Sequence, residues 1–264
     1  MPLCLVCGNS ADHMRKCSVC EEHNVKSYYC SKNCQVADWR QHRVFHSRIE
    51  EGQTVAELEA RLHFTEGCKI LKQAPDEARR CFAVSASLKY PPAMAKIGQC
   101  LECGLLGITK NIKEAVRIYR LAADMNSGDA YAILGRFYMS GNTEAGIDKD
   151  EEQALRLYRL AVDLNSGAGC LFLGKAYYNG CVSLREDKAE ALRLFRRSGG
   201  LGCGEGFTFE ADMHARGEGG LPRDEVECGR SLQRGAALGC HVAQQRLGML
   251  VLLGRSGQPQ SVAL

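Results

Sequence analysis

Cysteine and histidine residues gather near the amino terminus of this chain at spacings that suit a metal ion. Eight of them lie within the first 46 residues and form four pairs: Cys4 and Cys7, Cys17 and Cys20, Cys30 and Cys34, and His42 and His46. A tetrahedral zinc site takes four Cys or His ligands, and a turn at a C-x2-C spacing can aim two thiolates at one ion. The eight residues therefore predict two zinc ions. Coordination, rather than an apolar core, would hold so short a segment folded.

The elements that must position these ligands differ along the segment. Cys30 and Cys34 are four residues apart, as are His42 and His46, so a helical turn places both members of each pair on one face. The first two pairs suit short knuckles instead. Sequential pairing and an interleaved cross-brace would both close two sites, and the spacing alone leaves both arrangements open.

This segment resembles the MYND-type zinc finger. The matching runs are Cys17-Ser-Val-Cys20, Tyr29-Cys30-Ser-Lys-Asn-Cys34-Gln35, Asp38-Trp39 and Arg40-Gln-His42. The resemblance covers residues 4–46 and implies a cross-brace with two ligand sets: Cys4, Cys7, Cys30 and Cys34 for one zinc, and Cys17, Cys20, His42 and His46 for the other. His46 stands where the family usually has Cys, and imidazole is also an ordinary zinc ligand. His13 and His23 lie in the loops between pairs and are less favoured substitutes.

A disulfide framework is the alternative use of these cysteines. Six clustered Cys would suit a small secreted domain, but Met1-Pro2-Leu3-Cys4 leaves no room for a signal peptide. The most apolar stretch, Leu247–Leu253, is far shorter than the about 18 residues of a membrane span. We therefore expect no membrane segment and an intracellular, reducing location, in the cytoplasm, the nucleus or both.

Beyond this segment the chain repeats. A two-residue landmark recurs at spacings of 37, 39, 37 and 37 residues, at Ile97-Gly98, Leu134-Gly135, Leu173-Gly174, Glu210-Ala211 and Leu247-Gly248. A second glycine follows six residues after each landmark, and Ala115, Ala154, Ala191 and Cys228 recur at one further position. Repeats of this length predict stacked helical hairpins, each with a glycine turn. The two extra residues of the second unit fall in the loop 142–150, where an insertion costs little.

These units resemble Sel1-like repeats, a tetratricopeptide-related family. The best matches are Ala130-Tyr-Ala-Ile-Leu134-Gly135-Arg-Phe-Tyr138-Met-Ser-Gly141 and Gln153-Ala154-Leu-Arg-Leu-Tyr158-Arg-Leu-Ala161. Small residues at fixed offsets let neighbouring helices approach closely. In the fourth unit Glu210-Ala211 replaces Leu-Gly and His214 replaces Tyr, which leaves open whether that unit packs regularly.

The predicted protein is mostly α-helical, with a small two-zinc cross-brace finger followed by an α-solenoid of Sel1-like helical hairpins. We expect the finger at residues 1–47, a polar junction at 48–54, a degenerate helical hairpin at 55–92, the repeats at 93–254 and a mobile tail at 255–264. Thr54 and Glu57 have the spacing of a capping box for a helix that runs to Gln73. Pro75 suits the first turn of its partner helix, and Pro91-Pro92 separates this hairpin from the first clear repeat.

Charge makes nucleic acid an unfavourable partner. The formal net charge of +3 is small for 264 residues, and residues 1–50 hold seven Lys and Arg against five Asp and Glu. Zinc bound by four thiolates carries a formal charge of about −2, so the loaded finger is near neutral and releases few counterions from phosphates. Arg40, Arg43 and Arg48 lie in one predicted helical stretch, so a transcription or chromatin regulator with nucleic-acid contact is the alternative function.

No catalytic constellation stands out in the sequence. There is no Gly-rich phosphate loop, no G-x-S-x-G elbow and no H-E-x-x-H pair. The acidic run at Asp150-Glu151-Glu152 suits the start of a helix. Cys100-Leu-Glu-Cys103 is better explained by packing in a repeat helix than by metal or redox chemistry. MYND fingers also occur in SET-domain lysine methyltransferases, but the Asn-His motif of those enzymes is missing here, so we predict a protein that is not an enzyme.

The MYND resemblance also implies a binding mode. In family members that bind peptides, a proline-containing segment lies beside the strand near the second Cys pair and packs on a Gln and a Trp. The corresponding residues here are Ser18, Gln35 and Trp39, and a strand edge with an aromatic wall suits a rigid proline ligand. Trp39 could alternatively only cover the core of the finger.

Sel1-type superhelices are similar to adaptors that offer a concave surface to proteins. We therefore expect a zinc-dependent protein–protein interaction scaffold, with a proline-containing peptide at the finger and an unknown protein at the repeats. The sequence does not indicate an oligomeric state.

Overall fold

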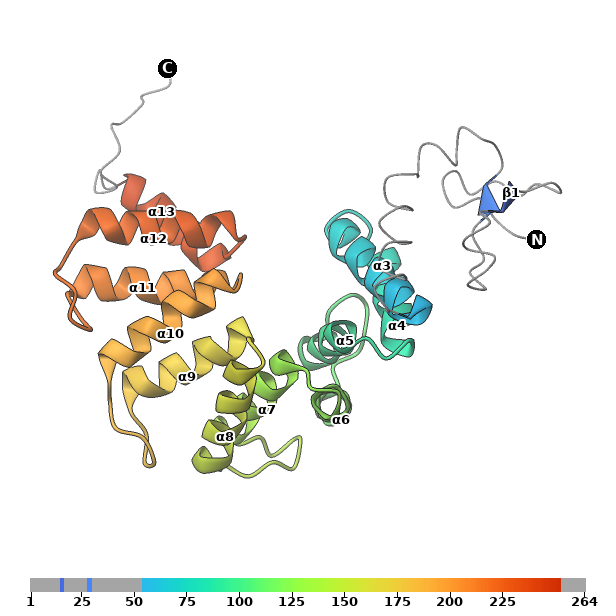
Figure 1. Ribbon diagram of the computed structural model, residues 1–264, viewed down its shortest axis with the longest axis horizontal. Coiled ribbons are helices and arrows are strands. Elements are labelled where there is room, and N and C mark those ends of the chain that lie inside the picture. Colours follow the sequence, from blue (N-terminus) through green and yellow to red (C-terminus); the bar gives the residue numbers. More distant parts are fainter. Residues whose placement is uncertain (1–14, 17–27, 30–53, 253–264) are drawn as a thin grey trace, which may run out of the picture. The chain divides into compact units, whose positions relative to one another are not determined.

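The structure of this chain is a computed structural model, and it describes residues 15–16, 28–29 and 54–252 (Figure 1). These residues form two short strands and 11 helices, which confirms the mostly α-helical prediction. The chain divides into two units, Met1–Ala93 and Met94–Leu264. Within the described ranges, no helix combines the length and the apolar character that crossing a bilayer requires.

Every residue predicted to bind zinc or peptide lies outside the described residues. This set comprises Cys4, Cys7, Cys17, Ser18, Cys20, Cys30, Cys34, Gln35, Trp39, His42 and His46. Residues 48–53 of the predicted junction and the predicted tail, 255–264, also lie outside them. The roles assigned to these residues stay predictions.

A two-stranded ladder and a helical hairpin make up the described part of the first unit. Strand β1 (Arg15–Lys16) pairs antiparallel with β2 (Tyr28–Tyr29). The hairpin consists of α3 (Val55–Ile70) and α4 (Pro75–Ser87). Pro75 occupies the first helical position of α4, as predicted, because that position needs no N–H donor.

The predicted capping box is present at the start of α3. The backbone N–H of Glu57 donates to Thr54 Oγ1 at 3.3 Å, and the backbone N–H of Thr54 donates to Glu57 Oε2 at 2.8 Å. The two side chains thereby satisfy two backbone donors that the start of a helix leaves open. The helix ends at Ile70 instead of the predicted Gln73, because the chain turns over residues 71–73.

The second unit is a stack of helical pairs. Its helices are α5 (Pro91–Cys103), α6 (Ile112–Asp124), α7 (Gly128–Ser140), α8 (Glu151–Asp163), α9 (Gly167–Asn179), α10 (Lys188–Gly200), α11 (Gly204–Arg216), α12 (Glu225–Ala237) and α13 (His241–Leu252). The first helices of the four pairs are α5, α7, α9 and α11, and α13 follows the fourth pair. This order confirms the predicted α-solenoid.

Pro91 and Pro92 lie after the hairpin, at the start of α5. The first of the two units ends at Ala93, next to the predicted boundary after residue 92. Proline is compatible with the first helical turn because its missing N–H has no partner there and its fixed φ is already helical.

Side-chain caps set the helix starts in the second unit. The N-cap residues that accept a backbone hydrogen bond are Asn111, Ser127, Asp150, Ser166, Asp187 and Asp224. The backbone N–H of Gln153 donates to Asp150 Oδ1 at 2.9 Å, so the acidic run starts α8 as predicted. Helix α8 ends at Asp163, and Asn165 beyond it adopts a φ of 55°.

Small residues at the helix contacts are fully buried, as the repeat pattern predicts. Those that expose 0% of their surface include Ala115, Ala122, Ala154, Ala161 and Ala191. In the fourth pair Cys228 takes the corresponding place and is 5% exposed. Ala211 of α11 and Leu232 of α12 belong to one buried cluster. The fourth pair, whose packing the sequence left open, therefore packs like its siblings.

The first helices contact one another along the stack: α7 lies against α9, α9 against α11, and α11 against α13. The second helices mainly contact the first helices before and after them. One side of the stack is therefore built by first helices alone. We call the surface formed by α7, α9, α11 and α13 the first-helix face.

The two-residue insertion of the second pair lies in the loop at residues 141–150, as predicted. A bridge between Asn142 and Ile147 closes this loop, whereas the loop after α9 closes with the shorter bridge between Cys181 and Leu184. The flanking helices keep 13 residues each. The insertion is thus absorbed in the loop.

Candidate functional site

The described part of the finger is limited to β1 and β2. In sequence, β1 directly precedes Cys17 and β2 directly precedes Cys30, and the MYND resemblance assigns these two cysteines to different zinc ions. The functional geometry that can be described lies in the repeats.

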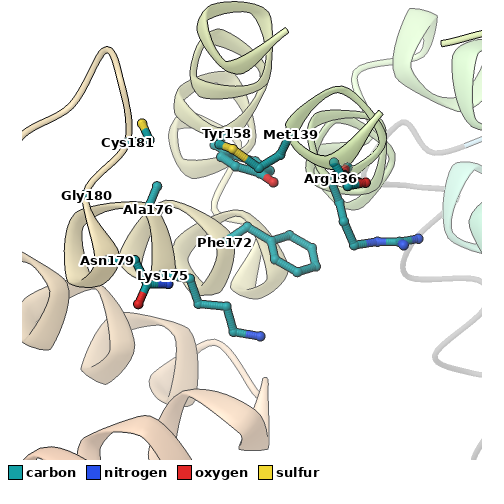
Figure 2. Close-up of a pocket in the computed structure, with 10 residues that line it drawn as sticks. Arg136, Met139, Tyr158, Phe172, Lys175, Ala176, Asn179, Gly180 and Cys181 are labelled. Carbon is teal, nitrogen blue, oxygen red and sulfur yellow. Dashed lines mark hydrogen bonds between the residues drawn. The ribbon is translucent and has the colours of Figure 1, made fainter. Parts of the chain in front are cut away.

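The first-helix face carries a pocket of about 290 Å³ between α7 and α9. Six of the residues that line it are Arg136 and Met139 of α7, Tyr158 of α8, and Phe172, Lys175 and Ala176 of α9. In Figure 2, the Phe172 ring lies between the side chains of Arg136 and Lys175. The pocket therefore combines an aromatic surface with two flanking cations.

The charge of the pocket lining is positive, since no acidic residue is among the described residues that form it. Arg136 donates to Glu102 Oε1 at 2.5 Å, and Lys175 Nζ donates to Glu205 Oε1 at 3.0 Å. The Arg136 and Lys175 side chains remain 39% and 30% exposed. Because a guanidinium has about five N–H donors and an ammonium about three, both cations retain donors for a ligand. The lining favours an anionic group.

Tyr158 closes the pocket from the side of α8 and is only 2% exposed. Its ring stacks on that of Phe172 with centroids 5.6 Å apart. Burial raises the pKa of Tyr158, so the hydroxyl stays protonated at neutral pH and can donate a hydrogen bond. This hydroxyl forms no hydrogen bond with any residue that the structure describes.

A buried carboxylate marks the fourth pair, where the repeat landmark has Glu instead of Leu. Glu210 is 3% exposed, and Arg196 Nε donates to its Oε1 at 2.7 Å. Arg234 lies 3.7 Å from the other carboxylate oxygen, and His214 Nε2 lies 4.0 Å from Oε1. Two arginines from the neighbouring second helices therefore compensate the buried charge. This compensation explains how the fourth pair stays regular despite its departure from the repeat pattern.

The cysteines of the C-x2-C run in α5 have separate environments. Cys100 is 1% exposed and packs in the interior as predicted, and burial raises the pKa of its thiol. Cys103 is exposed, so the packing explanation holds for only one of the two. Among the described residues, no group of three or more His, Cys, Asp or Glu could hold a metal ion.

The residues of the pocket were not among the predicted site residues. A signal was present, because a basic residue follows the landmark glycine only in the second and third units, at Arg136 and Lys175. The first and fourth units have Gln99 and Asp212 there. Comparing the units at this position could have indicated a cationic patch, but which side chains flank it depends on the stacking of the helices.

A stack of helical pairs with a pocket on one face is the architecture of a repeat protein that binds partners through its surface. The Sel1 repeat family matches residues 91–127, 128–166, 167–203 and 211–240, which is more than half of the chain, so the chain belongs to this family. The MYND finger family matches residues 4–46. None of the curated proteins compared with the chain matches it in sequence.

A solved structure shows the same fold. A Sel1 repeat protein from Oxalobacter formigenes is 21% identical, with a TM-score of 0.57 over 91% of this chain and 94% of that chain. The protective antigen c5321 of uropathogenic Escherichia coli is 22% identical, with a TM-score of 0.49 over 80% of this chain and 44% of that chain.

The two families found define the general role of this chain. Sel1 repeats and MYND fingers are protein-interaction modules without catalytic chemistry, and a MYND finger is a zinc-binding domain. Their presence on one chain supports an adaptor role.

Proposed function

We propose that this chain is an intracellular adaptor in which a zinc-loaded finger and the helical repeats each bind a protein. The observation that carries the proposal is the presence of two different interaction modules on one chain, a MYND finger at residues 4–46 and Sel1 repeats from residue 91 onward. Two modules that bind separate partners bring them to a high effective concentration. We assign the adaptor to the cytoplasm, the nucleus or both, because thiolate ligands persist in a reducing compartment.

The finger holds two zinc ions in this proposal. The first is bound by Cys4, Cys7, Cys30 and Cys34, and the second by Cys17, Cys20, His42 and His46. Four thiolates, or two thiolates and two imidazoles, are donor sets that suit tetrahedral zinc. When bound, the zinc ions supply structural cross-links and no reactivity.

A proline-containing peptide is the ligand that we assign to the finger. Ser18, Gln35 and Trp39 would contact it, with Trp39 as the aromatic wall. The repeats would bind the second protein on the first-helix face, where exposed cations and aromatic rings lie together. Nucleic acid is the less favoured partner because of the near-neutral charge of the loaded finger.

Affinity capture with mass spectrometry on the full chain tests the proposal. Trp39→Ala should remove one set of captured proteins, and the double charge reversal Arg136→Glu with Lys175→Glu should remove a different set. Arg156→Glu is the matched control, since Arg156 lies on a second helix and, within the described part of the chain, pairs only with the exposed Glu152. Capture of the same proteins by all four chains, wild type included, would contradict the adaptor proposal. If the wild type captures nucleic acid and Arg40→Glu does not, the result would favour the alternative function, a transcription or chromatin regulator that contacts nucleic acid.

A further inference from the structure

A polar triad joins the first and second helical pairs of the solenoid. The Tyr119 hydroxyl of α6 donates to Glu102 Oε2 of α5 at 3.1 Å, and Arg136 of α7 donates to Glu102 Oε1 at 2.5 Å. The Glu102 side chain is 18% exposed. A single carboxylate therefore satisfies a buried tyrosine hydroxyl and the basic residue that follows the landmark glycine of the next pair.

The same triad lacks its carboxylate one pair further along the stack. The unit spacings of 37 and 39 residues place Tyr158 at the position of Tyr119, and Lys175 at the position of Arg136. The position of Glu102 is occupied by Met139. A tyrosine and a basic residue are thus kept at the corresponding positions, while the position of the acceptor holds a thioether, which is a weak acceptor. The Lys175 ammonium donates to Glu205 of α11 instead.

The pocket lies where this acceptor is missing. Tyr158, Met139 and Lys175 all line it, and Figure 2 shows them together with Phe172. The Tyr158 hydroxyl has no hydrogen-bond partner among the described residues, although Tyr158 is only 2% exposed. The hydroxyl is not among the fully buried polar atoms that lack a partner, so it is open to the pocket and can donate to an external acceptor.

We propose that this pocket binds a carboxylate of a partner peptide, which takes the place that Glu102 occupies in the preceding pair. The carboxylate accepts hydrogen bonds from the Tyr158 hydroxyl and the Lys175 ammonium. An apolar residue next to it packs on Phe172 and Met139. The partner is therefore a peptide with an acidic residue beside an apolar one. This inference rests on the proposed function, because it names the ligand class of the first-helix face.

Three observations favour this occupant. The lining holds two cations and, among its described residues, no acid, which excludes a cationic ligand by repulsion and favours an anionic one. The Lys175 ammonium uses one of its N–H groups for Glu205 and can donate the others to a ligand. The volume of about 290 Å³ lies near the lower end of ligand pockets, which suits one or two side chains of a peptide.

Fluorescence anisotropy with the full chain tests the proposal. The probe is a fluorescein-labelled peptide with a central Leu-Glu-Leu between Gly-Ser-Gly flanks, and the control probe has Leu-Gln-Leu in the same frame. We expect the Glu peptide to bind at least about tenfold more tightly than the Gln peptide, because a charge-assisted hydrogen bond is lost. Tyr158→Phe keeps the ring but removes the hydroxyl, and it should weaken binding of the Glu peptide by about fivefold to tenfold.

Met139→Glu is the decisive variant, since it supplies the missing carboxylate from the chain itself. It should abolish binding of the Glu peptide while the thermal unfolding midpoint is retained or raised. Met139→Gln is the control for a polar side chain of similar size and should keep a preference for the Glu peptide. Failure of the wild type to bind either peptide, or equal binding by wild type and Met139→Glu, would overturn the proposal.

Affinity capture with these variants distinguishes a failure of the pocket proposal from a failure of the adaptor proposal. If captured proteins are lost with Arg136→Glu and Lys175→Glu but are retained by both Met139→Glu and Tyr158→Phe, the pocket proposal fails and the adaptor proposal stands. If Met139→Glu removes the same captured proteins as the double charge reversal, both stand.

Discussion

Gly135 of α7 lies in contact with the ring of Tyr158 of α8, so closely that a β-carbon at Gly135 would stand 2.6 Å from Tyr158 Cε1. The same relationship joins Gly98 to Tyr119 at 2.5 Å and Gly174 to a phenylalanine ring, that of Phe195, at 2.8 Å. The landmark glycine of each of the first three pairs is therefore the surface on which the aromatic residue of the second helix packs. This contact sets the distance between the two helices of a pair.

Gly135→Ala should destabilise the solenoid by about 1–3 kcal/mol, because the added methyl group overlaps the Tyr158 ring in a packed interior. Chemical unfolding followed by circular dichroism measures the change. Gly248→Ala is the matched control: Gly248 holds the landmark position in α13, and a β-carbon there would meet nothing within 4 Å. This control should be neutral or stabilising by up to about 1 kcal/mol. Equal effects of the two substitutions would contradict the packing argument.

In the fourth pair, Ala211 takes the place of the landmark glycine and Leu232 takes the place of the aromatic residue. Ala211 is 0% exposed and Leu232 is 1% exposed. Leu232→Phe alone should destabilise the chain, since the ring meets the Ala211 methyl group. Adding Ala211→Gly should recover stability, with a coupling energy of about 0.5–3 kcal/mol in a double-mutant cycle. Additive effects of the two changes would show that these positions are not partners.

Glu210→Gln should destabilise the chain by about 1–3 kcal/mol, because the substitution removes a buried charge that accepts a hydrogen bond from Arg196. The loss is moderated because the Arg196 side chain is 49% exposed and can be rehydrated. Glu152→Gln is the control, since Glu152 pairs with Arg156 on the exposed face of α8 and should change the free energy of unfolding by less than about 0.5 kcal/mol. Urea unfolding of both variants compares them, and a larger loss in the control would refute the role of burial.

Glu218 makes the folding stability of the chain depend on pH in the acidic range. Hydrogen bonds from Tyr178 at 2.5 Å and from Lys188 at 2.9 Å lower the pKa of Glu218. A carboxyl whose pKa is lowered on folding stabilises the protein fully above its unfolded pKa of about 4.5, and this contribution is lost as the pH falls through the lower folded pKa. Thermal unfolding between pH 3 and 7 should show Glu218→Gln less stable than the wild type at neutral pH, with the difference shrinking below about pH 4.5. A difference that stays constant with pH would rule out this linkage.

Metal analysis distinguishes the two ways of pairing the zinc ligands. We expect about two zinc ions per chain, and the double variant Cys4→Ser with Cys30→Ser should retain about one if those residues share a site. Sequential pairing would place them in different sites, so the same variant would then retain none. Chelation should remove the zinc from the wild type without loss of the helical signal of the repeats, because none of the helices in residues 54–252 has a group of three or more metal-binding side chains.

Local signals in the sequence were sufficient to place most of the helices. Asp150 and Thr54 cap their helices as predicted, and the 37-residue spacing of the landmark identified the helical pairs. These features depend on neighbours within one or two turns, which a sequence displays directly. Local sequence did not determine that Pro91-Pro92 opens α5, because proline fits both a break between elements and a first helical turn.

By itself, the sequence determined the repeat period, the helix caps, the family resemblances and the candidate zinc ligands, because each depends on residue type and short spacing. Only the tertiary structure decided that Arg196 reaches the carboxylate of Glu210 and that a pocket opens beside Tyr158. Contacts of this kind join side chains from different helices, and they depend on how far one helical pair is rotated against the next. That rotation results from the packing of many side chains at once, such as Tyr158 on Gly135, and no single position in the chain specifies it.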